Sequence, residues 1–179
     1  ELGVAAVRSS GVAFAGMTPI TPARILDTRN ANGVPGTSPL GRRSQIGFQV
    51  AGRGGVPANG VDAVALNVTI TGATASSFLT VWPTDAARPN ASSLNMTAGL
   101  TTANLVIAKV AADGTVSVYN NAGSVHVIAD VVAYSVDADH LTSLTPERIL
   151  DTRNGLGTGV AAPVPRRSSI DLTVTGVGG

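Results

Sequence analysis

One stretch of the sequence occurs twice, and this repeat predicts how the chain is organised. It first reads Thr21-Pro22-Ala23-Arg24-Ile25-Leu26-Asp27-Thr28-Arg29-Asn30, and it returns 124 residues later as Thr145-Pro146-Glu147-Arg148-Ile149-Leu150-Asp151-Thr152-Arg153-Asn154. The same offset aligns residues 21–55 with residues 145–179 without a gap, and 19 of these 35 positions are identical. A period of this length indicates a domain-sized unit in tandem rather than a solenoid of short repeats.

We call residues 19–55 copy one and residues 143–179 copy two. The repeat predicts a lead-in strand or linker over residues 1–18, a β-sandwich unit over residues 19–142, and the start of a next unit in copy two. Copy two carries apolar residues such as Ile170 and Val174, which need a surface to cover them. We therefore expect both copies to pack on strands of the Val56–Ser135 region, copy two either within the chain or across to a neighbouring molecule.

The composition is typical of a folded β-rich domain. Of the 179 residues, 44% are hydrophobic and 13% are charged, which provides enough apolar material for a core. The net charge is +1 and no aromatic residues are interleaved with the arginines, so nucleic-acid binding is not expected. No apolar stretch approaches the roughly 18 residues that cross a bilayer, so no membrane span is expected. The chain has no cysteine, which excludes disulfides and thiolate metal sites.

Alternating apolar residues predict about eight short strands and no helix. Residues 44–51 and 64–70 alternate with a period of two, and residues 78–82 form a further strand that Pro83 closes. The run 105–110 is apolar on both faces, as in a central strand, and Asp113-Gly114 predicts a hairpin to residues 115–119. The fold class predicted is all-β, an antiparallel and jelly-roll-like β-sandwich that is part of a tandem array.

Asp130 interrupts the apolar strand that ends near Ser135, and a carboxylate there needs a cationic partner. The repeated stretch offers arginines and a carboxylate of its own, so we expect a structural network of Arg24, Asp27, Arg29, Asp130, Arg148, Asp151 and Arg153. The alternative is a carboxylate site for sugar hydrolysis. If Asp130 is a buried partner, its replacement by Ala or Asn should destabilise the fold by about 3 kcal/mol or more.

Three weaker sites follow from single residues. A small glycan pocket is predicted around Trp82, with Asn95 and Arg88 as polar contacts. Calcium is a minor alternative at Asp113 or at Asp137 and Asp139, but neither place has a full loop motif. No metal site, no cofactor and no catalytic residue are predicted, because His126 and Asp130 lie four residues apart on one strand and cannot share a metal. Lys109 could form an isopeptide bond with Asn67 or Asn120 beside Asp130, although an ordinary partly packed lysine is preferred.

Several further motifs accompany the repeated stretch. They are Ala65-Leu66-Asn67-Val68-Thr69, Phe78-Leu79-Thr80-Val81-Trp82-Pro83, Ala91-Ser92-Ser93-Leu94-Asn95, Val118-Tyr119-Asn120 and His126-Val127-Ile128-Ala129-Asp130-Val131-Val132. Together with Arg24-Ile25-Leu26-Asp27-Thr28-Arg29 they resemble a repeat domain of secreted and cell-surface proteins of actinobacteria. The resemblance implies an exported, non-catalytic accessory module and transfers no ligand or catalytic residue.

The function expected from these observations is an extracellular stalk, adhesion or cell-wall attachment module that is not an enzyme. Its partners would be neighbouring repeat units, further copies of itself or surface glycans. A lectin-like module with a pocket near Trp82 is the first alternative, and a secreted hydrolase is the second.

Overall fold

The computed structural model describes residues 16–136, 144, 146–174 and 176, and its folded part consists of strands. The described residues contain no helix, and therefore none that could span a membrane. The eight strands are β1 (Thr18–Asp27), β2 (Ser44–Gln49), β3 (Ala63–Thr71), β4 (Ser77–Pro83), β5 (Leu94–Met96), β6 (Thr102–Lys109), β7 (Thr115–Asn120) and β8 (His126–Ser135). The predicted all-β class and the number of strands are confirmed.

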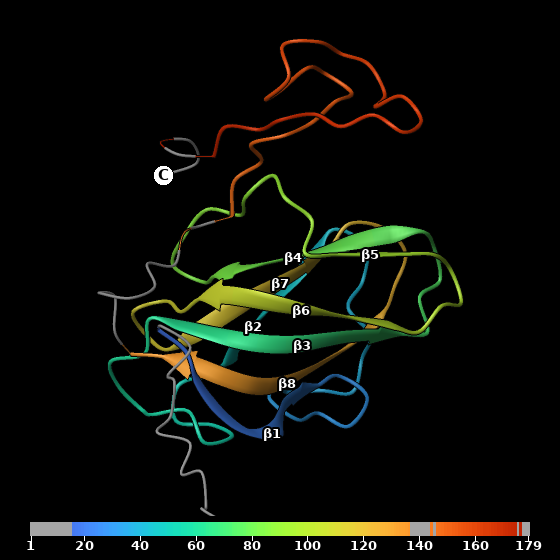
Figure 1. The fold of residues 1–179 in the computed structure, drawn as a ribbon. Coiled ribbons are helices and arrows are strands. Elements are labelled where there is room, and N and C mark those ends of the chain that lie inside the picture. The colour runs from blue at the N-terminus through green and yellow to red at the C-terminus, as the bar shows by residue number, and fades with distance from the viewer. Residues whose placement is uncertain (1–15, 137–143, 145, 175, 177–179) are drawn as a thin grey trace, which may run out of the picture.

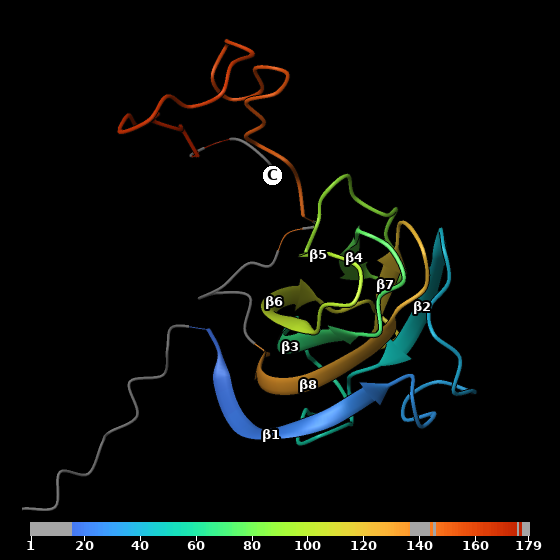
Figure 2. The same cartoon turned by 90° about the vertical axis from the view of Figure 1, so that its right-hand side faces the viewer.

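The strands form two four-stranded antiparallel sheets that pack against each other (Figures 1 and 2). One sheet has the order β1-β8-β3-β6 and the other has the order β2-β7-β4-β5. β3 shows why this sequence forms a sandwich: Val64, Leu66, Val68 and Ile70 alternate with smaller or polar residues and are all buried. Each such side chain contributes about 1.5–3 kcal/mol through its burial.

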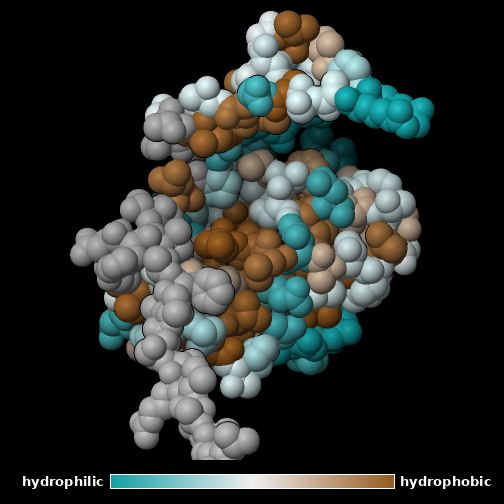
Figure 3. Space-filling model, in the orientation of Figure 1, coloured by the Kyte–Doolittle hydropathy of each residue, from teal (hydrophilic) through white to brown (hydrophobic). Residues whose placement is uncertain are grey.

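β6 differs from the prediction of a central strand, because it is the edge of its sheet. Leu105 is 60% exposed and Ile107 is 54% exposed. Figure 3 shows an apolar surface on this face of the molecule, where Figure 1 shows β6. Alternation alone cannot separate a strand covered on both faces from one with an apolar outer face. The error is therefore one of position in the sheet and not of strand formation.

The Asp113-Gly114 turn is also placed differently from the prediction. β6 pairs with β3, whereas β7 pairs with β2 and β4, so the turn crosses from one sheet to the other and does not close a hairpin. Gly114 has a φ of 80°, and a Cβ there would lie 2.6 Å from the Cβ of Ala51. The turn therefore requires glycine both for its backbone conformation and for the close approach of the chain.

Copy one covers one complete side of the sandwich. β1 is the edge of the first sheet and β2 is the edge of the second, while the opposite edges, β6 and β5, contact each other. Between Thr18 and Val50, the buried side chains of copy one are Ile25, Leu26, Asp27, Thr28, Leu40, Phe48 and Val50. Copy one thus closes the core along that side.

Copy two is not packed in this way. Residues 146–174 contain one isolated bridge, between Asp151 and Leu156, and no strand. The orange to red coil lies apart from both sheets in Figures 1 and 2. Ile170 is 40% exposed and Val174 is 61% exposed. The expectation that copy two packs on strands of the chain's own core is therefore wrong in this structure, because copy one already occupies the two edges on that side.

The predicted lead-in over residues 1–18 lies mostly outside the described residues, which begin at Gly16. The division between residues 142 and 143 stays a prediction.

Candidate functional site

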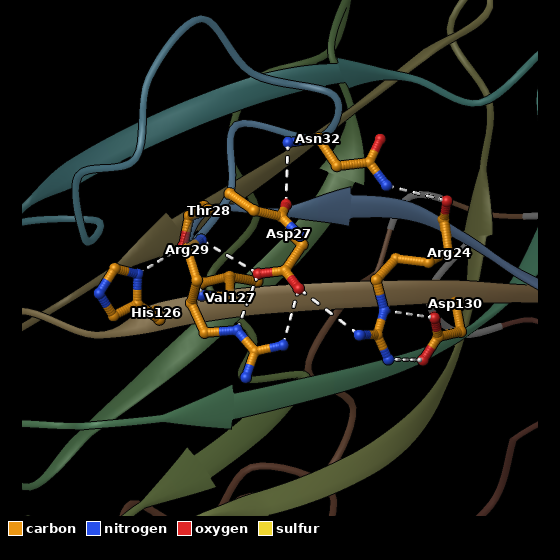
Figure 4. Close-up of polar contacts among 9 residues, drawn as sticks. Arg24, Asp27, Thr28, Arg29, Asn32, His126, Val127 and Asp130 are labelled. Carbon is orange, nitrogen blue, oxygen red and sulfur yellow. Dashed lines mark hydrogen bonds and ion pairs between the residues drawn. The ribbon is translucent and has the colours of Figure 1, made fainter.

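Asp27 is the centre of a compact turn at the end of β1 (Figure 4). The backbone of Asp27 bonds that of Asn32 in both directions, with N···O distances of 2.9 and 3.2 Å, which closes the loop. Its buried carboxylate accepts hydrogen bonds from the backbone N–H of Arg29 at 3.0 Å and from the Nε and Nη2 atoms of the same arginine at 2.9 and 2.7 Å. The guanidinium and the backbone of one residue therefore hold one carboxylate from two sides.

These contacts keep Asp27 ionised. The hydrogen bonds from the Arg29 side chain lower the pKa of Asp27 from 3.8 to about 2, against the opposing effect of burial. The same pairing raises the pKa of Arg29. An acid with so low a pKa has no proton to donate near neutral pH, so this arrangement suits an anchor better than a general acid.

Arg24 connects this turn to β8, as the sequence predicted. Its Nε and Nη2 atoms donate to the two carboxylate oxygens of Asp130 at 2.9 and 3.2 Å, and its Nη1 atom reaches Asp27 at 3.5 Å. However, the side chain of Asp130 is 19% exposed and that of Arg24 is 45% exposed. Asp130 is therefore not the fully buried partner of the prediction, and that description applies to Asp27, whose side chain is 0% exposed.

Thr28 forms a second attachment to β8 that the sequence analysis missed. Its hydroxyl oxygen accepts a hydrogen bond from the backbone N–H of Val127 at 3.0 Å and lies 3.0 Å from Nδ1 of His126. Thr28 is itself buried. The available signal was the repetition of this threonine at Thr152, but its partners are 98 and 99 residues away in the sequence, and only the pairing of β1 with β8 brings them together.

Copy two forms the same turn without a sheet beside it. Arg153 donates to Asp151 through its backbone N–H at 3.1 Å and through Nε at 2.8 Å, and Arg148 donates to Asp151 at 2.9 Å. The hydrogen bonds from Arg153 lower the pKa of Asp151. The backbone of Asp151 bonds that of Leu156, as Asp27 bonds Asn32. The predicted network thus exists as two separate clusters, one in each copy, and only the first includes Asp130.

The backbone confirms that the two turns have one conformation. Positive φ angles occur at matching positions: 61° at Ala31 and 80° at Gly155, 77° at Gly33 and 75° at Gly157. A Cβ on Gly33 would overlap the carbonyl oxygen of Ile25, and one on Gly157 would overlap that of Ile149. The turn is therefore a local property of the repeated stretch.

The predicted glycan residues do not gather around Trp82. The indole is 2% exposed, and its Nε1 donates to the carbonyl oxygen of Ala86 at 3.1 Å, so Trp82 belongs to the interior and offers no face to a ligand. Arg88 and Asn95 do line a common hollow of about 440 Å³, together with Phe78 and with Arg148 and Arg153 of copy two. The aromatic residue beside Arg88 is Tyr119, whose ring centre lies 3.9 Å from the guanidinium carbon.

The calcium and isopeptide alternatives find no assembled site in the described residues. The carboxylate of Asp113 accepts hydrogen bonds from the backbone and hydroxyl of Thr115, and Asp137 and Asp139 lie outside the described residues. Among the described side chains, no three of His, Asp and Glu gather at a metal-binding spacing.

Lys109 is paired with Ala63, four residues along β3 from Asn67, which corresponds to about 13 Å. The amide nitrogen of Asn120 is engaged with the carbonyl oxygens of Leu40, Gly41 and Gly123. One proposed amide partner is therefore distant from the lysine, and the amide of the other is already hydrogen-bonded to three carbonyl groups.

Compared with known proteins, the chain matches no family model and no curated protein. What the geometry defines is a two-sheet β domain with a repeated arginine–aspartate turn, which is docked on β8 in copy one and undocked in copy two.

Proposed function

We propose that this chain is a non-catalytic β-sandwich module of an exported, cell-surface repeat protein, in which it serves as a stalk, adhesion or cell-wall attachment unit. The observation that supports this most is the state of copy two. It has the turn of a docked copy one, yet its apolar side chains Leu156, Val160 and Val174 are 42%, 63% and 61% exposed. A segment that repeats the edge of a sandwich suits a tandem array in which every copy closes its own unit.

The order of the strands supports the finer fold as well. The orders β1-β8-β3-β6 and β2-β7-β4-β5 place consecutive strands in alternate sheets for most of the chain, which is the arrangement of a jelly roll. In this proposal the partners of the module are neighbouring repeat units and further copies of itself.

A longer chain tests the array directly. If residues 56–142 are appended after Gly179, copy two gains the same succession of strands that copy one has. We expect hydrogen exchange to show new protection at Ile149–Arg153 and Ser168–Val174, and the second unit to unfold cooperatively. The matched control carries Leu150→Asp, which places a charge at the position of the buried Leu26 and should leave copy two unprotected. A longer chain in which copy two exchanges as fast as in the original chain contradicts the proposal.

A glycan-binding module is a second candidate, which the hollow around Arg88 favours. The hollow combines Phe78 with Asn90, Ser92 and Asn95, and such a mixture of apolar surface and amides is typical of small sugar sites. Arg88 is stacked on Tyr119, and this contact orients the guanidinium that lines the hollow.

Binding to purified cell wall and to a glycan panel separates the two candidates. If Arg88→Ala removes a saturable affinity while the melting temperature stays unchanged, the glycan function is supported. Arg42→Ala, at an exposed site away from the hollow, is the matched control. If the module acts only as a stalk, neither the unmodified chain nor either variant should show saturable glycan binding.

A further inference from the structure

Copy two retains the residues by which copy one closes the core. All seven buried positions of copy one between Thr18 and Val50 have an identical or apolar residue in copy two. Ile25, Leu26, Asp27, Thr28 and Val50 are repeated as Ile149, Leu150, Asp151, Thr152 and Val174, while Leu40 and Phe48 correspond to Val164 and Leu172.

Copy two also retains the groups that attach copy one to β8. Arg148 matches Arg24, which binds Asp130, and Thr152 matches Thr28, which bonds to Val127 and contacts His126. Because the turn around Asp151 already has the conformation of the turn around Asp27, copy two needs little local rearrangement to present these groups.

The place of copy one in the fold allows it to be replaced. Its two strands are the outer edges of the two sheets on one side of the sandwich, and they precede the other strands of the described residues (Figure 2). Copy one can therefore leave the β8 and β7 edges without any of the described strands having to pass through a loop.

Copy two follows β8 in the chain after a short connection, so it is tethered close to the β8 edge. The start of β1 lies beside the end of β8, since Thr18 is paired with Tyr134. Thr142 is the residue that aligns with Thr18, and six residues separate it from Ser135. Six residues are enough to reverse the chain in an antiparallel hairpin, and so short a tether gives copy two a high effective concentration at its own β8.

We propose that copy two exchanges with copy one on the β8 and β7 edges of the same sandwich. The edges are thus a docking surface with two alternative occupants in one chain. This inference goes beyond the proposed function, because it depends on the two copies and the sheet edges and not on where the protein works.

Copy one is the preferred occupant, in agreement with the structure. Leu172 fills less volume than Phe48, which is 3% exposed. Glu147 would bring a charge to the position of Ala23, which packs against the core, and Leu156 cannot reproduce the 2.7 Å hydrogen bond between Asn32 and Arg53. The state with copy two docked is therefore the minor state of an equilibrium.

Cysteine pairs detect this minor state, since the chain has no cysteine of its own. Arg24 lies directly opposite Asp130 across β1 and β8. The aligned residue Arg148 therefore comes opposite position 130 only when copy two has replaced β1. The test chain carries Arg148→Cys with Asp130→Cys. Arg24→Cys with Asp130→Cys is the control for docked copy one, and Val160→Cys with Asp130→Cys measures random contacts of the exposed coil.

Under slow oxidation, we expect the Arg148→Cys pair to close within one molecule, at least tenfold faster than the Val160→Cys pair and slower than the Arg24→Cys pair. Adding Leu26→Asp, which weakens copy one, should accelerate closure at least tenfold, and adding Leu150→Asp should abolish it. Non-reducing gels and peptide mapping identify the bond. A rate no faster than that of the Val160→Cys pair, or a bond found only between two molecules, overturns the proposal.

The unfolding transitions of chains without added cysteines test the proposal independently. Leu26→Asp alone should retain a cooperative unfolding transition, because copy two substitutes for the damaged copy. Leu26→Asp combined with Leu150→Asp should lose it. If Leu26→Asp alone is unfolded to the same extent as the double variant, copy two does not dock and the proposal is wrong.

Discussion

The two copies of the repeated stretch share a turn but differ in everything around it. In both, an aspartate carboxylate is held by the arginine two residues later and reached by the arginine three residues earlier. Leu26 is nevertheless 0% exposed, whereas Leu150 is 36% exposed, and Ile46 lies in β2 whereas Ile170 lies in no strand. The comparison shows that the turn forms from local sequence and that the strands form only where a sheet edge receives them.

The largest expected difference in stability between the copies is at the aligned residues Phe48 and Leu172. Phe48→Ala should lower the free energy of unfolding by about 3–5 kcal/mol, because it opens a cavity in the core. Leu172→Ala, at the aligned position, should change it by less than about 0.5 kcal/mol. Both are measured by urea unfolding in a Leu150→Asp background, so that copy two cannot replace a weakened copy one. Equal losses in the two variants would show that copy two is also part of the core.

The buried carboxylates give the next largest difference. Asp27→Asn removes the charge that Arg29 and Arg24 surround and should cost about 2–3 kcal/mol, somewhat less than a fully buried pair because both arginines are half exposed. Asp151→Asn should leave the urea midpoint of the sandwich unchanged, since its turn lies outside the sheets. Both variants are again measured in the Leu150→Asp background. A shift of the midpoint in Asp151→Asn would contradict the separation of the two copies.

At acidic pH, Asp27 should affect the stability of the sandwich and Asp151 should not. The pKa of Asp27 is about 2 in the folded chain and 3.8 for an unperturbed aspartate, which represents the unfolded chain. Between pH 2 and pH 3.8 the unfolded chain therefore binds more protons than the folded chain. The contribution of Asp27 is therefore fully present above about pH 4 and is lost as the pH falls from 3.8 to about 2. Asp27→Asn should flatten the stability profile in this range, as followed by thermal melts, whereas Asp151→Asn should reproduce the profile of the unmodified chain.

The smallest effect is expected at Arg24 and Asp130. Because these side chains are 45% and 19% exposed, Asp130→Asn should cost about 0.5–1.5 kcal/mol rather than the 3 kcal/mol or more that a fully buried pair would predict. Arg148→Gln in copy two is the matched control and should have no effect on the sandwich. A double-mutant cycle of Arg24→Gln and Asp130→Asn measures the pair itself, and a coupling energy above about 3 kcal/mol would restore the buried-pair interpretation.

The regular features of the chain could be predicted from the sequence because they depend on neighbouring residues. The period-two alternation of Val64, Leu66, Val68 and Ile70 predicted β3, and the charged Asp130 within an otherwise apolar strand predicted an arginine partner. The repeat predicted two segments of equal local structure, and the turns at Asp27 and Asp151 have that structure. Each of these inferences concerns contacts within one strand or one turn, or a charge that cannot be left unpaired.

Position within the sheets was decided only by the tertiary structure. Whether Leu105 lies at an edge, whether Asp113-Gly114 closes a hairpin and whether Trp82 faces a ligand all depend on strand pairs whose members lie between 32 residues (Ile70 and Thr102) and 116 residues (Thr18 and Tyr134) apart in the sequence. The same holds for the copies themselves. Their sequences are nearly equivalent at the seven buried positions between Ile25 and Val50, but one side of the sandwich can accommodate only one β1 and one β2, so copy one is docked there and copy two lies outside both sheets.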